Sequence, residues 1–505
     1  MKKVKLLSMI IALALLVTTI AGCGTSKSGA NETTVAATTT AAATTTAAPT
    51  EEVKPKLTFL AAFAKYDPNQ DIIAKELEKL TGYQVEYFML PAERAEEKLN
   101  LDMSSGVEYD IMFLVNVLYR NMLAKDIIIP LDELIDKFGS NIKAANSQKT
   151  WDNVRVKGKI YGVPATTAGV IGQSIGIRQD ILDELSLKVP TTVDEFYTVA
   201  KTIKEKKNII PLTANKPFVD IIASGFGLSV AWKEVNGSAV HRLKQEGMKE
   251  YVEFMKKLYA EGLIDSEMPV NKAENIKEKF TSGKAAMLTW GWGDAPSVKP
   301  ALAKAFPEAK MSLVHPLKGS NGQQEISTDK GVNKMAMIHK ASKNAGHAIK
   351  FINAMVDQSN FKYLALGEEG VHFKVENNKY IPILPKFNDE RNNATWFLAG
   401  IIEEKWPSYW SARVAKDVNM FETFSEMNID NATIGKSDLL GYVPGLEKWA
   451  KYSQALDKLE SDTLIKIIAG GESMDAFQTL LETWDKEGGL EATQEVNDWL
   501  KNRGK

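Results

Sequence analysis

The chain has 505 residues, of which 44% are hydrophobic, and its 62 lysines and arginines nearly balance 64 aspartates and glutamates, for a formal net charge of −2. Because this balance lacks a basic excess, we expect no nucleic acid and no anionic lipid surface as a partner. The single cysteine excludes an internal disulfide and a metal cluster held by several thiolates.

The first 22 residues have the three parts of an export signal. MKKVK carries three lysines, residues 6–20 are a short apolar run, and Ala21-Gly22 precede Cys23. The apolar run has 15 residues, fewer than the roughly 20 that a membrane-spanning helix needs. We therefore predict a signal peptide over residues 1–22, whose three lysines leave with it, so that the formal charge changes from −2 to −5.

Residues 23–56 are rich in Thr and Ala and contain almost no large apolar side chains. Such a segment cannot bury enough surface to offset the entropy lost on ordering. We predict a disordered tether, whose Thr-rich repeats are candidates for glycosylation.

From residue 57 the composition becomes globular, and about 450 residues exceed what one hydrophobic core normally spans, so two domains or lobes are expected. Strand patterns at KLTFLAAFA, YQVEYFML and YDIMFLVN alternate with helix patterns at DPNQDIIAKELEKLTG and ERAEEKLNLDMSSG. This β-α-β-α-β order is typical of a mostly parallel sheet.

The rest of the chain continues to mix helices and strands. GKIYGVPATTAGVIGQSIGIRQDILDEL predicts a turn, an extended passage and a helix from about Asp180. Further helices are expected near residues 191–206, 246–262 and 342–358, and strands near 285–292, 310–319 and 330–340. The predicted fold class is α/β.

Two patterns suggest a hydrolase. GQSIG fits G-x-S-x-G, but Ser174 is followed by strand-like alternation, whereas a nucleophile elbow needs a helix directly after the serine. Glu368 and Glu369 are adjacent and would point apart, unlike the carboxylate pair of a retaining glycosidase. We therefore expect no catalytic residue and no enzyme activity, and a secreted hydrolase remains the less favoured alternative.

Metal-binding patterns are also weak. Asp67, Asn69, Asp71 and Glu78 have the spacing of a calcium loop, but Ile72 stands where the loop requires Gly. Helix capping explains these residues better. The five histidines include no H-x-x-x-H pair, so we expect no metal site and no cofactor.

The order of several motifs resembles the extracellular family 1 solute-binding proteins of ABC importers, especially the large Gram-positive lipoproteins of oligosaccharide uptake. The likeness runs from about residue 57 to 505. It rests on the lipobox-like IAGC ending at Cys23 and on segments of the chain body: IIIPLDELID, GKIYGVP, IGIRQDILDELSLKVPTTVDEFY, FTSGKAAMLTWGW, LGEEGVHFKV and IIAGGESMDAFQTLLETWDKEGGLEATQEVNDWL.

The resemblance implies a periplasmic-binding-protein-like fold, in which two α/β lobes are joined by hinge strands and enclose a solute between them. It implies crossings near residues 170–178, which include GQSIG, and near 331–340. Lobe 1 would then comprise residues 57–172 plus 331–385, and lobe 2 residues 173–330 plus 386–505. A monomer is expected, held at the extracellular face of the cytoplasmic membrane by lipid on Cys23, with ABC permease subunits as partners.

The resemblance also implies an oligosaccharide ligand, neutral or uronic, while a peptide or another small organic solute stays open. Sugars need flat apolar faces and hydroxyl partners, so aromatic side chains on loops are the first candidates. Trp290 and Trp292 would share one side of an extended segment, with Asp294 next in register, unless both indoles pack in the core. A second aromatic cluster, with core packing as its alternative, comprises Trp406, Tyr409 and Trp410.

Three further candidates lie at strand ends or on the crossing, where open α/β sheets bind ligands. Tyr66 follows the first strand, and Asn116 ends the third, where its amide can both donate and accept. Arg178 on the crossing could hold a hydroxyl or a uronate carboxylate, with a salt bridge to a neighbouring acid as the alternative.

Overall fold

The computed structural model of the protein describes residues 53–62, 66–91, 93–443 and 445–503. The predicted signal peptide, Cys23 and most of the predicted tether lie outside these residues. The end of the tether lies within them: Lys54 Nζ donates to the Thr81 carbonyl at 2.9 Å, and Lys56 pairs with Glu86 at 2.8 Å. The compact part of the chain thus begins at Lys54, slightly before the predicted tether end.

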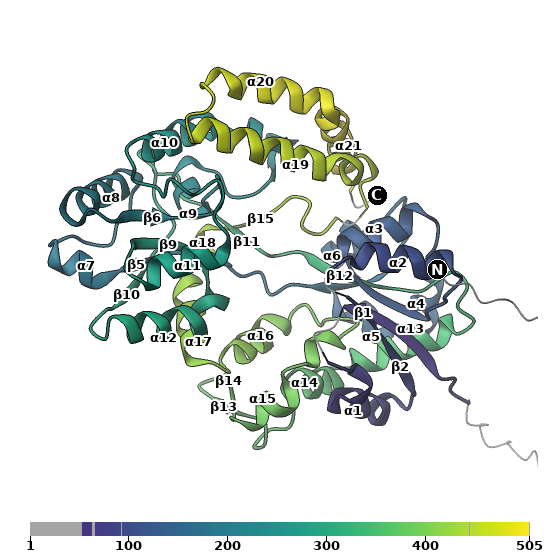
Figure 1. Ribbon diagram of the computed structural model, residues 1–505. Coiled ribbons are helices and arrows are strands. Elements are labelled where there is room, and N and C mark those ends of the chain that lie inside the picture. The colour runs from purple at the N-terminus through teal and green to yellow at the C-terminus, as the bar shows by residue number, and fades with distance from the viewer. Residues whose placement is uncertain (1–52, 63–65, 92, 444, 504–505) are drawn as a thin grey trace, which may run out of the picture. The chain divides into compact units, whose positions relative to one another are not determined.

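The first sheet has the strand order β2-β1-β3-β12-β4. Its strands are β1 (Leu57–Ala62), β2 (Val85–Leu90), β3 (Ile111–Val115), β4 (Val163–Thr166) and β12 (Val332–Met337). Helices α1 (Ile72–Thr81) and α2 (Ala95–Ser104) connect the first three strands, which pair in parallel (Figure 1). The predicted β-α-β-α-β unit is confirmed.

Helix capping fixes where α1 begins and ends. Asp71 accepts a hydrogen bond from the Ile73 amide at 2.9 Å, and Gly82 ends the helix in the left-handed region at φ 70°. Asp67 accepts from the Asn69 amide at the start of the short turn η1 (Pro68–Gln70). The prediction that Asp67 and Asp71 are caps is therefore confirmed.

The second sheet has the order β10-β5-β9-β6, formed by β5 (Gln173–Arg178), β6 (Ile210–Thr213), β9 (Ala285–Gly291) and β10 (Met311–Val314). Strands β6 and β9 are parallel, and β5 runs antiparallel to both β9 and β10. In the first sheet β12 likewise runs antiparallel to β3 and β4. In each sheet the reversed strand is the one that arrives directly from a crossing between the two sheets.

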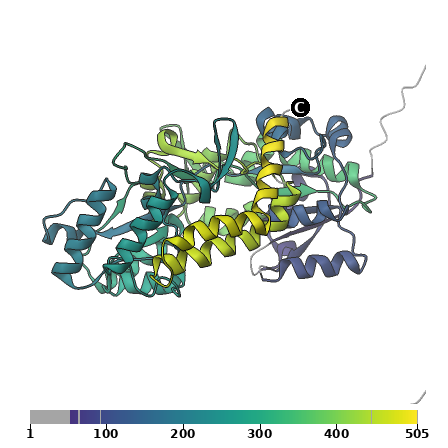
Figure 2. The same cartoon turned by 90° about the horizontal axis from the view of Figure 1, so that it is seen from above.

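Each sheet belongs to its own core. The first core contains buried residues of β1, β3 and β12 together with α13 (Ala345–Met355) and α14 (Gln358–Leu366). The second core contains β5 and β6 with α8 (Val193–Lys207), α10 (Met248–Ala260), α19 (Glu447–Ile468) and α20 (Asp475–Trp484). Helices α19 and α20 lie side by side in both views (Figures 1 and 2).

The chain after residue 385 divides between the two cores. Phe397, Trp406 and Tyr409 pack in the first core, whereas residues from Val443 onward pack in the second. Assigning all of residues 386–505 to lobe 2 is thus wrong for the part around α16 (Trp406–Val414). The sequence pattern shows that a helix has an apolar face, but it does not say which of two cores receives that face.

No helix among the described residues is both long and apolar enough to cross a membrane.

Candidate ligand-binding site

In both sheets, the carboxyl ends of neighbouring strands lie where the chain crosses from one sheet to the other. In the first sheet β3 and β4 end where β12 begins, and in the second β6 and β9 end where β5 begins. From Thr166 to Gln173 the chain makes seven residue steps, which span at most about 25 Å when extended. The two edges are therefore held close together, and in open α/β sheets ligands bind outside such edges.

A cavity of about 330 Å³ lies at the edge of the first sheet. Strands β3, β4 and β12, the turn η5 (Ala394–Trp396), helix α16 and the crossings all contribute to it. Its lining residues are Phe113, Ala165, Thr166, Thr167, Ala168, Asp329, Asn333, Lys334, Thr395, Trp396, Leu398, Ile401, Trp406 and Trp410.

Helix α16 supplies one aromatic wall of this first cavity. Trp406 and Trp410 are four residues apart, so they lie on one face of the helix, with ring centroids 5.7 Å apart. Tyr409 lies on another face, 5% exposed, and packs against Phe361 and Tyr380. The predicted aromatic cluster thus divides: Trp410 and Trp406 line the cavity, with Trp406 only 6% exposed and also part of the first core, whereas Tyr409 belongs to the core alone.

Lys334 is the side chain in this cavity that sequence reasoning missed. Its Nζ lies 4.8 Å from the ring centroid of Trp396 and 5.1 Å from that of Phe113. Within the described part of the chain no carboxylate lies within 4 Å of this ammonium. Burial lowers the pKa of Lys334.

Two polar atoms at the cavity are buried and lack a hydrogen-bond partner among the described residues: Thr166 Oγ1 and Trp410 Nε1. Thr166 is 4% exposed. An unsatisfied buried polar group costs about 1–3 kcal/mol, so a ligand with hydrogen-bonding groups would recover that free energy here.

A second cavity, of about 270 Å³, lies at the edge of the second sheet. Lys277 and Asp294 form an ion pair of 2.7 Å beside it, and Asp294 also accepts from the Gly291 amide at 3.1 Å. Burial raises the pKa of Asp220, which lines the same cavity. The other lining residues are Gln173, Ser174, Ala214, Asn215, Lys216, Phe218, Val219, Ile221, Ala273, Ile276, Thr289 and Trp290.

Trp290 and Trp292 do not share one side of a strand, contrary to the prediction. Strand β9 ends at Gly291, and Trp292 begins the turn η4 (Trp292–Asp294), which the Asp294 carboxylate closes. Trp290 is 2% exposed in an apolar cluster at the second cavity. Trp292 instead packs edge-on against Trp410 and Phe424.

Ser174 lies inside β5, and its Oγ donates to the carbonyl of Val314 on the neighbouring strand at 3.1 Å. The next helix, α7 (Gln179–Glu184), begins five residues later. The expected strand around Ser174 is confirmed, and this serine is not on a strand-to-helix elbow.

The three remaining candidates line neither cavity. Asn116 begins α3 (Asn116–Ala124), and its Nδ2 donates to the Val332 carbonyl at 2.5 Å, which ties two strand ends together. Arg178, at the other end of β5 from Gln173, binds Asp180 through two hydrogen bonds of 2.8 and 2.6 Å. Tyr66 packs against the first core.

A family model described as bacterial extracellular solute-binding protein matches residues 73–368. The chain is similar to the polygalacturonan/rhamnogalacturonan-binding protein YtcQ of Bacillus subtilis (24% identity over 472 residues, 89% of this chain and 92% of the relative). It is also similar to the fructooligosaccharide ABC transporter substrate-binding protein FusA of Streptococcus pneumoniae (26% over 345 residues, 60% and 61%).

Among solved structures, the alginate-binding protein AlgQ2 superposes with a TM-score of 0.65 at 20% identity, covering 89% of this chain and 98% of that one. The shared fold confirms the predicted arrangement of two α/β lobes joined by crossing strands.

Proposed function

The chain belongs to the bacterial extracellular solute-binding proteins, and on that premise we propose that it captures an oligosaccharide outside the cell and delivers it to the permease of an ABC importer. The first cavity is the observation that carries the proposal. It combines the indoles of Trp406 and Trp410, which suit the apolar faces of sugar rings, with buried polar atoms that lack partners. Both relatives with a stated ligand are named for carbohydrates.

Capture would work through the crossings, which are hydrogen-bonded to one another. The Val170 amide donates to Asp329 Oδ1 at 2.6 Å, and the Thr167 amide donates to the Gly331 carbonyl at 2.9 Å. Asn431, which lies on neither crossing, donates from Nδ2 to the Gly169 carbonyl at 2.7 Å. Such a joint lets the two sheets move as bodies. A ligand that contacts both edges stabilises the arrangement in which it has the higher affinity, and the permease would recognise that arrangement.

Export and lipid attachment at Cys23 are part of the proposal and are supported by the sequence at residues 1–23. Metabolic labelling with a fatty acid tests them: label should enter the wild-type protein and be absent from Cys23→Ala, which should also leave the membrane fraction. Light scattering of the purified protein tests the expected monomer.

The binding function is tested by titration calorimetry against a panel of oligosaccharides and peptides, with mass spectrometry of each ligand after incubation. We expect a bound oligosaccharide that is recovered unchanged. Affinity for peptides alone would replace the ligand class, and a converted ligand would show a hydrolase.

A further inference from the structure

Lys334 carries a positive charge into a cavity where a neutral sugar would not need one. Its ammonium lies 5.1 Å from the ring centroid of Phe113 and 4.8 Å from that of Trp396. The faces of these rings attract a cation, but they do not replace the water or the anion that an ammonium normally contacts. Among the described residues, Asp329 is the one acid that lines the cavity; it is not within 4 Å of the ammonium, and its carboxylate accepts from the Val170 amide.

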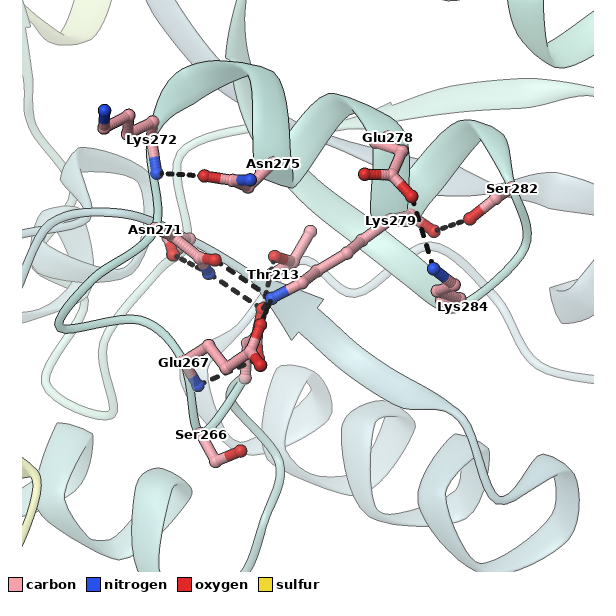
Figure 3. Close-up of polar contacts among 12 residues, drawn as sticks. Thr213, Ser266, Glu267, Asn271, Lys272, Asn275, Glu278, Lys279, Ser282 and Lys284 are labelled. Atoms are coloured by element: carbon pink, nitrogen blue, oxygen red, sulfur yellow. Dashed lines mark hydrogen bonds and ion pairs between the residues drawn. The ribbon is translucent and has the colours of Figure 1, made fainter.

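Lys279 is a lysine of this protein whose ammonium is hydrogen-bonded to neighbouring side chains. Its Nζ lies 2.6 Å from Asp265, 2.6 Å from Glu267 and 2.9 Å from the side chain of Asn271 (Figure 3). Burial would lower the pKa of Lys279, but the hydrogen bonds to both acids outweigh it and raise that pKa. Lys334 has none of these partners in the described residues, and its recorded contacts are with the rings of Phe113 and Trp396.

The local backbone directs Lys334 and its neighbour into the same cavity. Successive side chains of a regular strand point to opposite faces. In β12 the pairing with β4 is irregular between Val332 and Lys334, where Val332 faces Thr166 and Lys334 faces Ala165. Such a bulge redirects side chains and is common beside binding sites. It lets Asn333 and Lys334 line one cavity together with Thr166.

We propose that the first cavity binds a sugar unit that bears a carboxylate, a uronate, with Lys334 as the cationic contact. The indoles of Trp406 and Trp410 would cover the apolar face of the ring. Thr166 Oγ1 and Trp410 Nε1 would bond its hydroxyls. This inference rests on the proposed function, because it specifies which class of oligosaccharide the same site prefers.

The test compares an oligogalacturonate with its fully methyl-esterified form, which removes the charge and keeps the ring hydroxyls. Titration calorimetry should show that the wild-type protein binds the acid form at least about tenfold more tightly. Lys334→Met should abolish that preference, because it lowers the affinity for the acid form more than the affinity for the ester, and Lys334→Arg should restore part of the preference. Lys379→Met removes the same charge from an exposed strand position and should change neither affinity.

Thermal unfolding of Lys334→Met controls for folding. Because the variant removes an unpaired ammonium from apolar surroundings, its Tm should equal or exceed that of the wild type. Equal binding of the acid and the ester, or an acid preference that survives Lys334→Met, would overturn the uronate inference but leave oligosaccharide capture standing. Absence of binding to every oligosaccharide, acidic or neutral, would overturn both.

Discussion

Trp292 meets Trp410 edge-on, with ring centroids 6.2 Å apart and ring planes at 76°. Trp292 follows β9 of the second sheet, whereas Trp410 belongs to α16, which packs with the first core. The contact therefore joins the two sheet systems through an aromatic pair, and one of its members also lines the first cavity. A ligand in that cavity would lie beside the Trp292–Trp410 contact, and that contact depends on how the two sheets are arranged.

Trp410→Ala should weaken oligosaccharide binding by about tenfold or more, because an aromatic contact contributes roughly 0.5–1.5 kcal/mol beyond the area that it buries. Tyr409→Phe is the matched control: it keeps the ring in the core and changes a side chain that does not line the cavity. Titration calorimetry checks both. Equal loss in the two variants would mean that α16 acts through packing and not through contact with the ligand.

Trp290→Ala and Trp292→Ala should have different effects on stability and on ligand affinity. Trp290 is almost fully buried in an apolar cluster, so its truncation should cost about 3–5 kcal/mol of the free energy of unfolding. Trp292 is only partly buried, so its truncation should cost less stability, and it should reduce ligand affinity indirectly, through loss of its contact with the cavity-lining Trp410. Urea unfolding and calorimetry on the same samples separate the two effects. A larger loss of stability in Trp292→Ala than in Trp290→Ala would contradict this assignment.

Gly331→Ala should damage the hinge. A Cβ at Gly331 would lie 2.2 Å from the Gly441 carbonyl oxygen, and that carbonyl accepts from the Val332 amide. The backbone must shift, which should cost about 1–3 kcal/mol and lower ligand affinity. Gly172, on the other crossing, has no atom within 4 Å of an added Cβ, so Gly172→Ala should behave like the wild type. Thermal unfolding and ligand titration check both variants. Unchanged stability and affinity in Gly331→Ala would show that the backbone at this crossing can shift away from Gly441 without loss.

His241 should make stability fall in mild acid. Burial, with a contribution from Arg242 and Lys244, lowers its pKa from 6.5 to about 3. Below pH 6.5 the unfolded state therefore binds a proton that the folded state excludes, and the free energy of unfolding should drop by up to about 1.4 kcal/mol per pH unit, levelling off below pH 3. Burial raises the pKa of Glu460 and Asp457, which face the ring, and their proton uptake opposes this loss.

The contribution of His241 is isolated by His241→Gln, because the variant keeps both acids. Urea unfolding of the two proteins at pH 7.5, 6 and 5 should give a steeper decline for the wild type (on the order of 1 kcal/mol more). Parallel declines would show that the imidazole titrates with the same pKa in the folded and unfolded states.

The strand and helix patterns were largely sufficient to predict the elements. The alternation of β1, β2 and β3 with α1 and α2 is a local property, since apolar spacing and caps such as Asp71 act within a few residues. The strand character of Ser174 followed from the same kind of pattern. The prediction was wrong at the turn after Gly291. There the Asp294 carboxylate accepts a hydrogen bond from the Gly291 amide and ends the strand, and the strand pattern contains no sign of that bond.

By itself, then, the sequence determined the α/β class and the family resemblance, and it predicted the crossings and an export signal that lies outside the described residues, because each depends on the order of residues along the chain. Only the tertiary structure decided which candidates share a cavity. Arg178 forms an ion pair with Asp180, and Tyr409 packs in the first core. Lys334, one lysine among many in the sequence, lies beside Trp396. Binding sites form where distant segments meet, and the burial and missing partners that mark Lys334 exist only after those segments have packed.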